Sequence, residues 1–99
     1  MLNPVAFTDL RAYIKKRLAY AQYRVGSTWY KVEIQDVSIL TDGTVRVKVD
    51  IPASGQTVNR VAVYNNVGDQ WAYQDCNIVV SSEQTGILFW FDFTIEEGG

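Results

Sequence analysis

The 99-residue chain contains no histidine and only one cysteine, Cys76. Without histidine it lacks the commonest general base and the commonest metal ligand of proteins. A single cysteine excludes a disulfide within the chain and, with no histidine, a tetrahedral zinc site of the usual ligand types. The sequence also has no G-x-S-x-G, P-loop or G-x-G-x-x-G motif. We therefore predict that the protein is not an enzyme, with no catalytic residues, metal or cofactor.

Positive charge is absent from the last part of the chain, because all nine lysines and arginines lie within residues 1–60. Residues 1–26 carry five basic side chains and one acidic one, whereas residues 61–99 carry six acidic side chains. A basic beginning and an acidic end can attract each other within one molecule, or head to tail between copies. The formal net charge of −2 argues against a nucleic-acid partner, because proteins that bind nucleic acids usually present a basic surface.

Length and composition indicate one globular domain over residues 1–99. A hydrophobic share of 47% is ordinary for a folded protein. No apolar run approaches the roughly 20 residues of a membrane-spanning helix, so we expect no membrane partner.

The beginning of the chain has the pattern of an amphipathic helix. Asn3 and Pro4 fit the N-cap and the first helical position, and Gly26 could end the helix with a positive φ. Apolar residues recur at helical steps of three and four: they are Phe7, Leu10, Ile14, Leu18 and Ala21. We predict a helix over about residues 4–23.

The rest of the chain alternates as antiparallel strands do, over about residues 28–95. The clearest alternation covers residues 45–51. A change of parity at Gln35-Asp36 predicts a bulge, and Asp42-Gly43 predicts a hairpin with a type I′ turn. Residues 96–99 form an acidic, glycine-containing tail. The predicted fold is α+β: one N-terminal amphipathic helix packed on an antiparallel sheet or small β-sandwich of about five strands.

Four residues form a second stripe on the predicted helix: Tyr13, Arg17, Tyr20 and Arg24. Tyrosine and arginine at this spacing can stack as cation–π neighbours, and both are enriched at interface hot spots. The stripe is either a partner-binding surface or the edge of the core, where tyrosines pack and arginines reach past them to solvent.

Two further features have alternative interpretations. Trp29, Trp71 and Trp90 could bind a sugar or other small ligand, or could pack in and around the core. Asp92 either lies on a solvated side near the end of its strand or is buried with a basic partner, Arg46 or Lys48, on the neighbouring hairpin.

Two stretches resemble phage proteins. The run I-P-A-S-G-Q-T-V-N-R-V-A-V-Y-N-N-V-G-D-Q-W-A-Y is similar to a pattern in phage tail-collar fibre proteins, in which an Ile-Pro strand end precedes a glycine-containing loop and a hairpin. The matching residues are Val61, Val63, Tyr64, Gly68 and Ala72, and the departures are Arg60 for Glu, Ala62 for Gly and Asn65 for Asp. The run Y-A-Q-Y-R-V-G-S-T-W-Y-K-V-E-I resembles small prophage proteins encoded among tail genes. The resemblance implies a protein that builds or decorates the virion.

The predicted function is that of a non-enzymatic structural or assembly protein of a bacteriophage virion, in the tail, the baseplate or fibre attachment. Its partners would be itself, as a homo-oligomer, and other virion proteins. It would be made in the host cytoplasm and located in the virion. The alternatives are a small β-rich module that binds a carbohydrate or other small ligand and, less favoured, a helix-plus-curved-sheet fold with a hydrophobic pocket.

Overall fold

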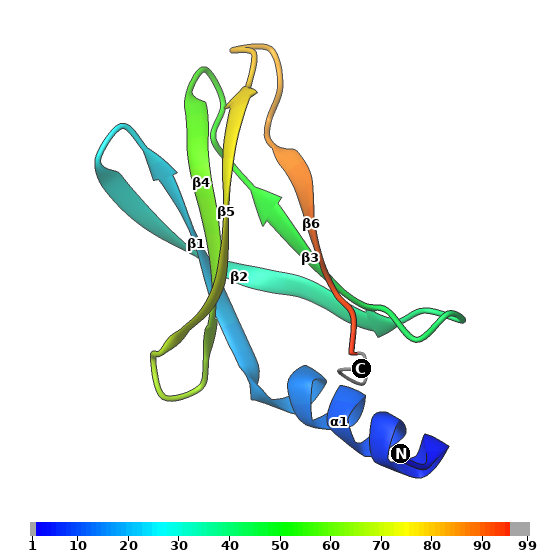
Figure 1. The fold of residues 1–99 in the computed structure, drawn as a ribbon. Coiled ribbons are helices and arrows are strands. Elements are labelled where there is room, and N and C mark those ends of the chain that lie inside the picture. Colours follow the sequence, from blue (N-terminus) through cyan, green and yellow to red (C-terminus); the bar gives the residue numbers. More distant parts are fainter. Residues whose placement is uncertain (1, 96–99) are drawn as a thin grey trace.

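The computed structural model describes residues 2–95 and consists of one helix followed by six antiparallel strands (Figure 1). The elements are α1 (Pro4–Arg17), β1 (Leu18–Val25), β2 (Thr28–Ile39), β3 (Val45–Ile51), β4 (Thr57–Asn65), β5 (Gln70–Val79) and β6 (Ile87–Phe93). The strands form one sheet in the order β5-β4-β1-β2-β3-β6. The α+β class with an antiparallel sheet is therefore confirmed, with six strands instead of about five. The predicted tail at residues 96–99 lies outside the described part of the chain.

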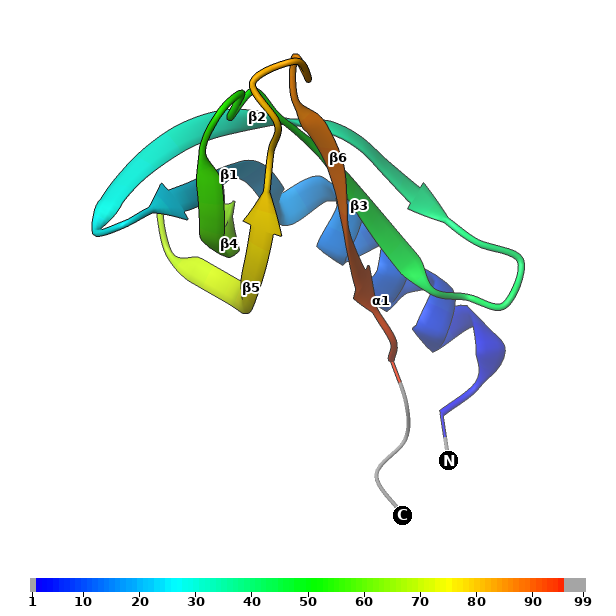
Figure 2. The ribbon, with the colours of Figure 1, turned by 90° about the horizontal axis from the view of Figure 1, so that it is seen from above.

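The long strand β2 makes the sheet curl. Its first part pairs with β1 and its second part with β3. Between them the register shifts from Ile34 to Asp36, which confirms the predicted bulge at Gln35-Asp36. A bulge bends its strand and increases the local twist. In Figure 2, β2 arches over the molecule, and the sheet becomes a half-barrel that is open between β5 and β6.

The core lies inside this half-barrel. The inward side chains of β3 are fully buried, and they are the odd-numbered, apolar residues of the alternation predicted for residues 45–51. Val47, Val49 and Ile51 pack with inward side chains of β1, β4 and β6 in one continuous cluster. The largest fully buried side chains are Val45, Val47, Val49, Ile51, Val58, Val61, Val63 and Val80.

The helix is shorter than the sequence pattern predicts. Asn3 and Pro4 are at the N-cap and N1, although the Asn3 side chain makes no capping hydrogen bond. The prediction of helix to about residue 23 is wrong, because α1 ends at Arg17 and residues 18–25 are strand β1. β1 is a central strand with β2 on one side and β4 on the other. Pairing with a strand on each side, together with burial of the Ala21 side chain in the core, outweighs local helix propensity.

Two glycine turns differ from their predicted forms. Gly26 has a positive φ of 61°, but it begins the two-residue turn of the β1–β2 hairpin and does not end a helix. In the β2–β3 turn, Gly43 has φ of 89° while Asp42 does not have a positive φ, so the predicted type I′ turn is wrong. The Gly43 amide donates to the carbonyl oxygen of Leu40 at 2.9 Å, which closes a tight turn over residues 40–43.

Helix α1 lies at one end of the half-barrel (Figure 1). None of its residues is buried, and of its predicted apolar face Ile14 packs against the core cluster while Leu10 is exposed. The Tyr13 ring lies 6.4 Å from the Trp71 ring of β5, centroid to centroid. The radius of gyration is 15.0 Å, compared with about 13 Å for a compact domain of this length. Within residues 2–95, no helix has the length and apolar character needed to cross a membrane.

Candidate functional site

Tyr20 and Arg24 lie together on the outward face of β1. Both belong to the stripe predicted for a helix, but in a strand a separation of four residues also returns side chains to the same face. Their partners in register on β4 are Tyr64 and Arg60. The Tyr20 and Tyr64 rings stack with centroids 5.0 Å apart. Two of the four predicted partner-binding residues are therefore brought together by strand periodicity, on the outside of the sheet.

The cations on this outward face lie over aromatic rings. The pairs, with the distance from cation to ring centroid, are Lys31–Tyr20 (4.3 Å), Arg60–Tyr73 (4.3 Å) and Arg24–Trp29 (5.5 Å). All three distances are within the roughly 6 Å over which a ring attracts a cation. We call this surface the cation–aromatic face, formed by Tyr20, Arg24, Trp29, Lys31, Arg60, Tyr64 and Tyr73. The sequence pattern did not predict Lys31, Arg60, Tyr64 and Tyr73 as members, because residues 18–25 were predicted as helix and not as the strand that joins them.

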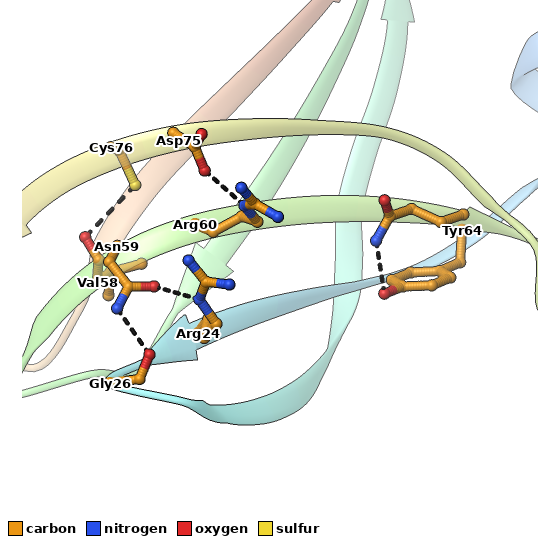
Figure 3. Close-up of polar contacts among 9 residues, drawn as sticks. Arg24, Gly26, Val58, Asn59, Arg60, Tyr64, Asp75 and Cys76 are labelled. Carbon is orange, nitrogen blue, oxygen red and sulfur yellow. Dashed lines mark hydrogen bonds and ion pairs between the residues drawn. The ribbon is translucent and has the colours of Figure 1, made fainter.

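Hydrogen bonds hold the two arginines in place (Figure 3). Arg24 Nε donates to Asn59 Oδ1 at 2.7 Å, and Asn59 Nδ2 donates to the carbonyl oxygen of Gly26 at 2.9 Å. Arg60 Nε donates to Asp75 Oδ1 at 2.5 Å. These hydrogen bonds fix the position of both guanidinium groups on the surface of the sheet.

A second ion pair lies on the outward side of β3 and β6. Arg46 donates from Nε and Nη2 to the two carboxylate oxygens of Asp92, each at 2.9 Å. Asp92 is exposed and also paired, so it combines parts of the two alternatives considered for it. The Arg46–Asp92 and Arg60–Asp75 pairs each join a base of the first sixty residues to an acid of the remainder. The charge asymmetry of the sequence is therefore satisfied in part within one molecule.

These pairs predict a loss of stability in acid. Hydrogen bonds from Arg60 and Arg46 lower the pKa values of Asp75 and Asp92. A lowered folded-state pKa stabilises the fold above the unfolded value of about 4, and this contribution is lost as pH falls through the folded value. We expect the double variant D75N D92N to show a flatter dependence of the urea midpoint on pH below about 4 than wild type. Because both carboxylates are exposed, the difference should be small and should shrink in high salt. An unchanged pH profile would contradict the assigned pairs.

Tyr13 and Arg17, the other two predicted partner-binding residues, lie on α1 and not on the cation–aromatic face. The Arg17 guanidinium is 5.9 Å from the centroid of the Tyr13 ring. The Nε atoms of Arg11 and Arg17 are buried and have no hydrogen-bond partner among the described residues. The predicted stripe is thus divided into a helix pair and a strand pair.

The three tryptophans lie at three separate places. Trp29 belongs to the cation–aromatic face, Trp71 contacts Tyr13 of the helix, and Trp90 lies on β6 beneath the Arg46 guanidinium, 4.2 Å from its ring centroid. In the part of the chain that the structure describes, no ring contact joins two tryptophans and no pocket is present. The structure therefore does not bring the predicted ligand-binding residues into one platform.

The single cysteine is held in a structural contact. The Cys76 thiol donates to the carbonyl oxygen of Val58, with sulfur and oxygen 3.4 Å apart. Burial raises the pKa of the Cys76 thiol, and the neighbouring Asp75 raises it further. A raised pKa keeps the group in the less nucleophilic thiol form. Between residues 2 and 95, no group of three or more Cys, Asp or Glu side chains could hold a metal ion.

Comparison with known proteins gives no relative for this chain. No protein-family model matches it, and neither curated proteins nor solved structures show a similarity to it. The arrangement of side chains on the sheet is therefore the basis for assigning a function.

Proposed function

We propose that this protein is a non-enzymatic structural or assembly protein of a bacteriophage virion, which works through protein–protein contacts made by the cation–aromatic face. The observation that carries the proposal is the set of three cations held over aromatic rings on one outward surface. Arginine, tyrosine and tryptophan are the residues enriched at interface hot spots. The setting in a tail, baseplate or fibre attachment follows from the resemblance of residues 51–73 to phage tail-collar fibre proteins.

The face suits a partner that presents carboxylates. Among the described residues Lys31 forms no ion pair, and the hydrogen bond of Arg24 is to a neutral amide, although Asp75 lies close enough to interact with the Arg24 charge. The rings beneath them exclude water from one side of each cation. An incoming carboxylate could then form charge-assisted hydrogen bonds with Lys31 and with Arg24, whose guanidinium group is already held by Asn59.

A second copy of the chain offers such carboxylates. Asp69 lies in the β4–β5 turn and Glu83 in the loop before β6, and both are exposed. Neither forms an ion pair within the described residues. A contact between the cation–aromatic face of one copy and an acidic turn of the next is heterologous, so it produces a ring or an open array of subunits.

The test is the molar mass measured by light scattering from about 50 mM to about 1 M salt. We expect wild type to associate at low salt and to lose this association at high salt, because screening weakens contacts between exposed charges. The double variant R24A K31A removes two cations of the face and should weaken association about tenfold or more.

The matched control is K15A K16A, which removes the same charge from exposed positions of α1, outside the face. It should associate as wild type does. Equal weakening in the two double variants would show that net charge, and not the face, drives association. A mass that does not depend on salt in wild type would also contradict the proposed contact.

A further inference from the structure

Strand β6 is a regular and largely apolar edge of the sheet. It pairs with β3 through seven successive residues, from Ile87 to Phe93, with no shift of register. Its other side pairs with no strand of the described chain. Natural sheet edges are usually protected by lysine, proline, a bulge or a covering segment, because a row of free amide and carbonyl groups can pair with another chain. β6 has one charged residue, Asp92, and this is already bonded to Arg46.

The opposite edge, β5, has the protection that β6 lacks. Its pairing with β4 is interrupted by two register shifts. It also presents exposed polar side chains, namely Gln70, Gln74, Asp75 and Asn77. Of the two free edges of the half-barrel, only β6 is regular enough to accept another strand along its whole length.

Burial decreases from β3 to β6, as expected where a layer is incomplete. The inward side chains of β3 are fully buried, whereas on β6 only Phe91 is buried and Phe89 and Phe93 remain partly exposed. On the outward side, Leu88 is 49% exposed and Trp90 is 47% exposed. A strand added beside β6 would cover side chains on both faces.

We propose that β6 pairs antiparallel with β6 of a second copy, about a two-fold axis at Trp90. In this register Trp90 lies opposite Trp90 of the second copy, and Phe89 lies opposite its Phe91. Leu88 meets Asp92, whose charge is paired with Arg46, and Ile87 meets Phe93, so no like charges are opposed. Inward residues meet inward residues, which continues the apolar layer across the axis.

A second copy is the occupant that this pattern favours, because the same seven residues satisfy both sides of the contact. Such an interface is isologous and closes as a dimer. It goes beyond the proposed function, since it uses a different surface from the cation–aromatic face. It is built from apolar and backbone contacts, so salt should not weaken it.

The first test is the molar mass in about 1 M salt, where contacts between exposed charges are screened. Wild type is expected to be a dimer. The variant L88E places a carboxylate opposite Asp92 of the second copy and should weaken the dimer at least tenfold, since charges at an edge oppose pairing and like charges directly opposite each other destabilise a strand pair. The control V79E makes a similar change on the other edge, at a residue that is 72% exposed, and should remain dimeric. A wild-type monomer in high salt, or equal weakening by V79E, overturns the inference.

The second test fixes the register by oxidative cross-linking in a C76S background. Opposed residues of antiparallel strands have Cα atoms about 4.5–5.5 Å apart, within the range for a disulfide. The variant W90C should therefore form a covalent dimer. In the control L88C, the two copies of residue 88 are offset by four residues, about 13 Å, and should not cross-link. Equal cross-linking of both variants, or of neither when circular dichroism shows both folded, overturns the two-fold register.

These outcomes are separable from those of the proposed function. Loss of the high-salt dimer in L88E leaves the salt-sensitive association of the cation–aromatic face in place. The variant R24A K31A should in turn keep the high-salt dimer.

Discussion

Replacing Ile51 by alanine is expected to lower the free energy of unfolding by about 2–5 kcal/mol. Ile51 ends β3 with none of its surface exposed, and it belongs to the continuous core cluster of the half-barrel. Truncation removes apolar contacts and leaves a cavity that the β3 backbone, paired with β6 at this residue and with β2 up to Val49, cannot readily close. The melting temperature should fall by about 10 °C or more, since 1 kcal/mol corresponds to about 4–8 °C in a domain of this size.

Thermal and urea unfolding would measure this change, with V79A as the control. Val79 is 72% exposed, so its truncation should change the free energy of unfolding by no more than about 0.5 kcal/mol. A cost below about 1 kcal/mol for I51A would mean that the two parts of the curled sheet do not share one packed core.

Replacing Gly86 by alanine is expected to destabilise the protein by about 1–3 kcal/mol. A Cβ atom at Gly86 would lie 2.6 Å from the carbonyl oxygen of Ile51 and 3.2 Å from the Cα of Pro52. Both neighbours are backbone atoms at the end of β3, so neither can rotate away as a side chain would. The loop before β6 would have to move from β3, and the first residue of β6 would move with it.

The control for G86A is T85A, at the exposed neighbouring position, which should have little effect. Urea unfolding measures the loss of stability, and the molar mass in high salt measures whether β6 still pairs. We expect G86A to weaken the dimer as well as the fold. If G86A unfolds at the same urea concentration as wild type, the close approach of the two backbones is not required for stability.

The features predicted correctly from the sequence are those that depend on neighbouring residues. The alternation of residues 45–51 fixes which side chains of β3 are buried, because successive strand residues point to opposite faces. The parity change at Gln35-Asp36 marks the bulge for the same reason. The hairpin at Asp42-Gly43 follows from the tolerance of glycine for positive φ, although the turn type was wrong.

The end of the helix could not be found in this way. A separation of four residues keeps Tyr20 and Arg24 on one face in a helix and equally in a strand. The signal that favours the strand is Gly26 within a two-residue turn, flanked on both sides by β-branched and aromatic residues. Without that hairpin, β structure appeared to begin at about residue 28 instead of Leu18.

The sequence by itself determined the absence of histidine chemistry, the α+β class, the alternation of the strands and the uneven placement of charge. Only the tertiary structure decided that β1 is a central strand, that Lys31 and Arg60 join Tyr20 and Arg24 on one face, and that β6 is an edge strand among the described residues. The reason is the separation along the sequence between the residues that make contact. Periodicity reflects side chains a few positions apart, whereas the site depends on contacts such as Arg24 with Asn59, 35 residues away, and Arg46 with Asp92, 46 residues away. Strand order sets those contacts, and it is chosen by the packing of the whole core.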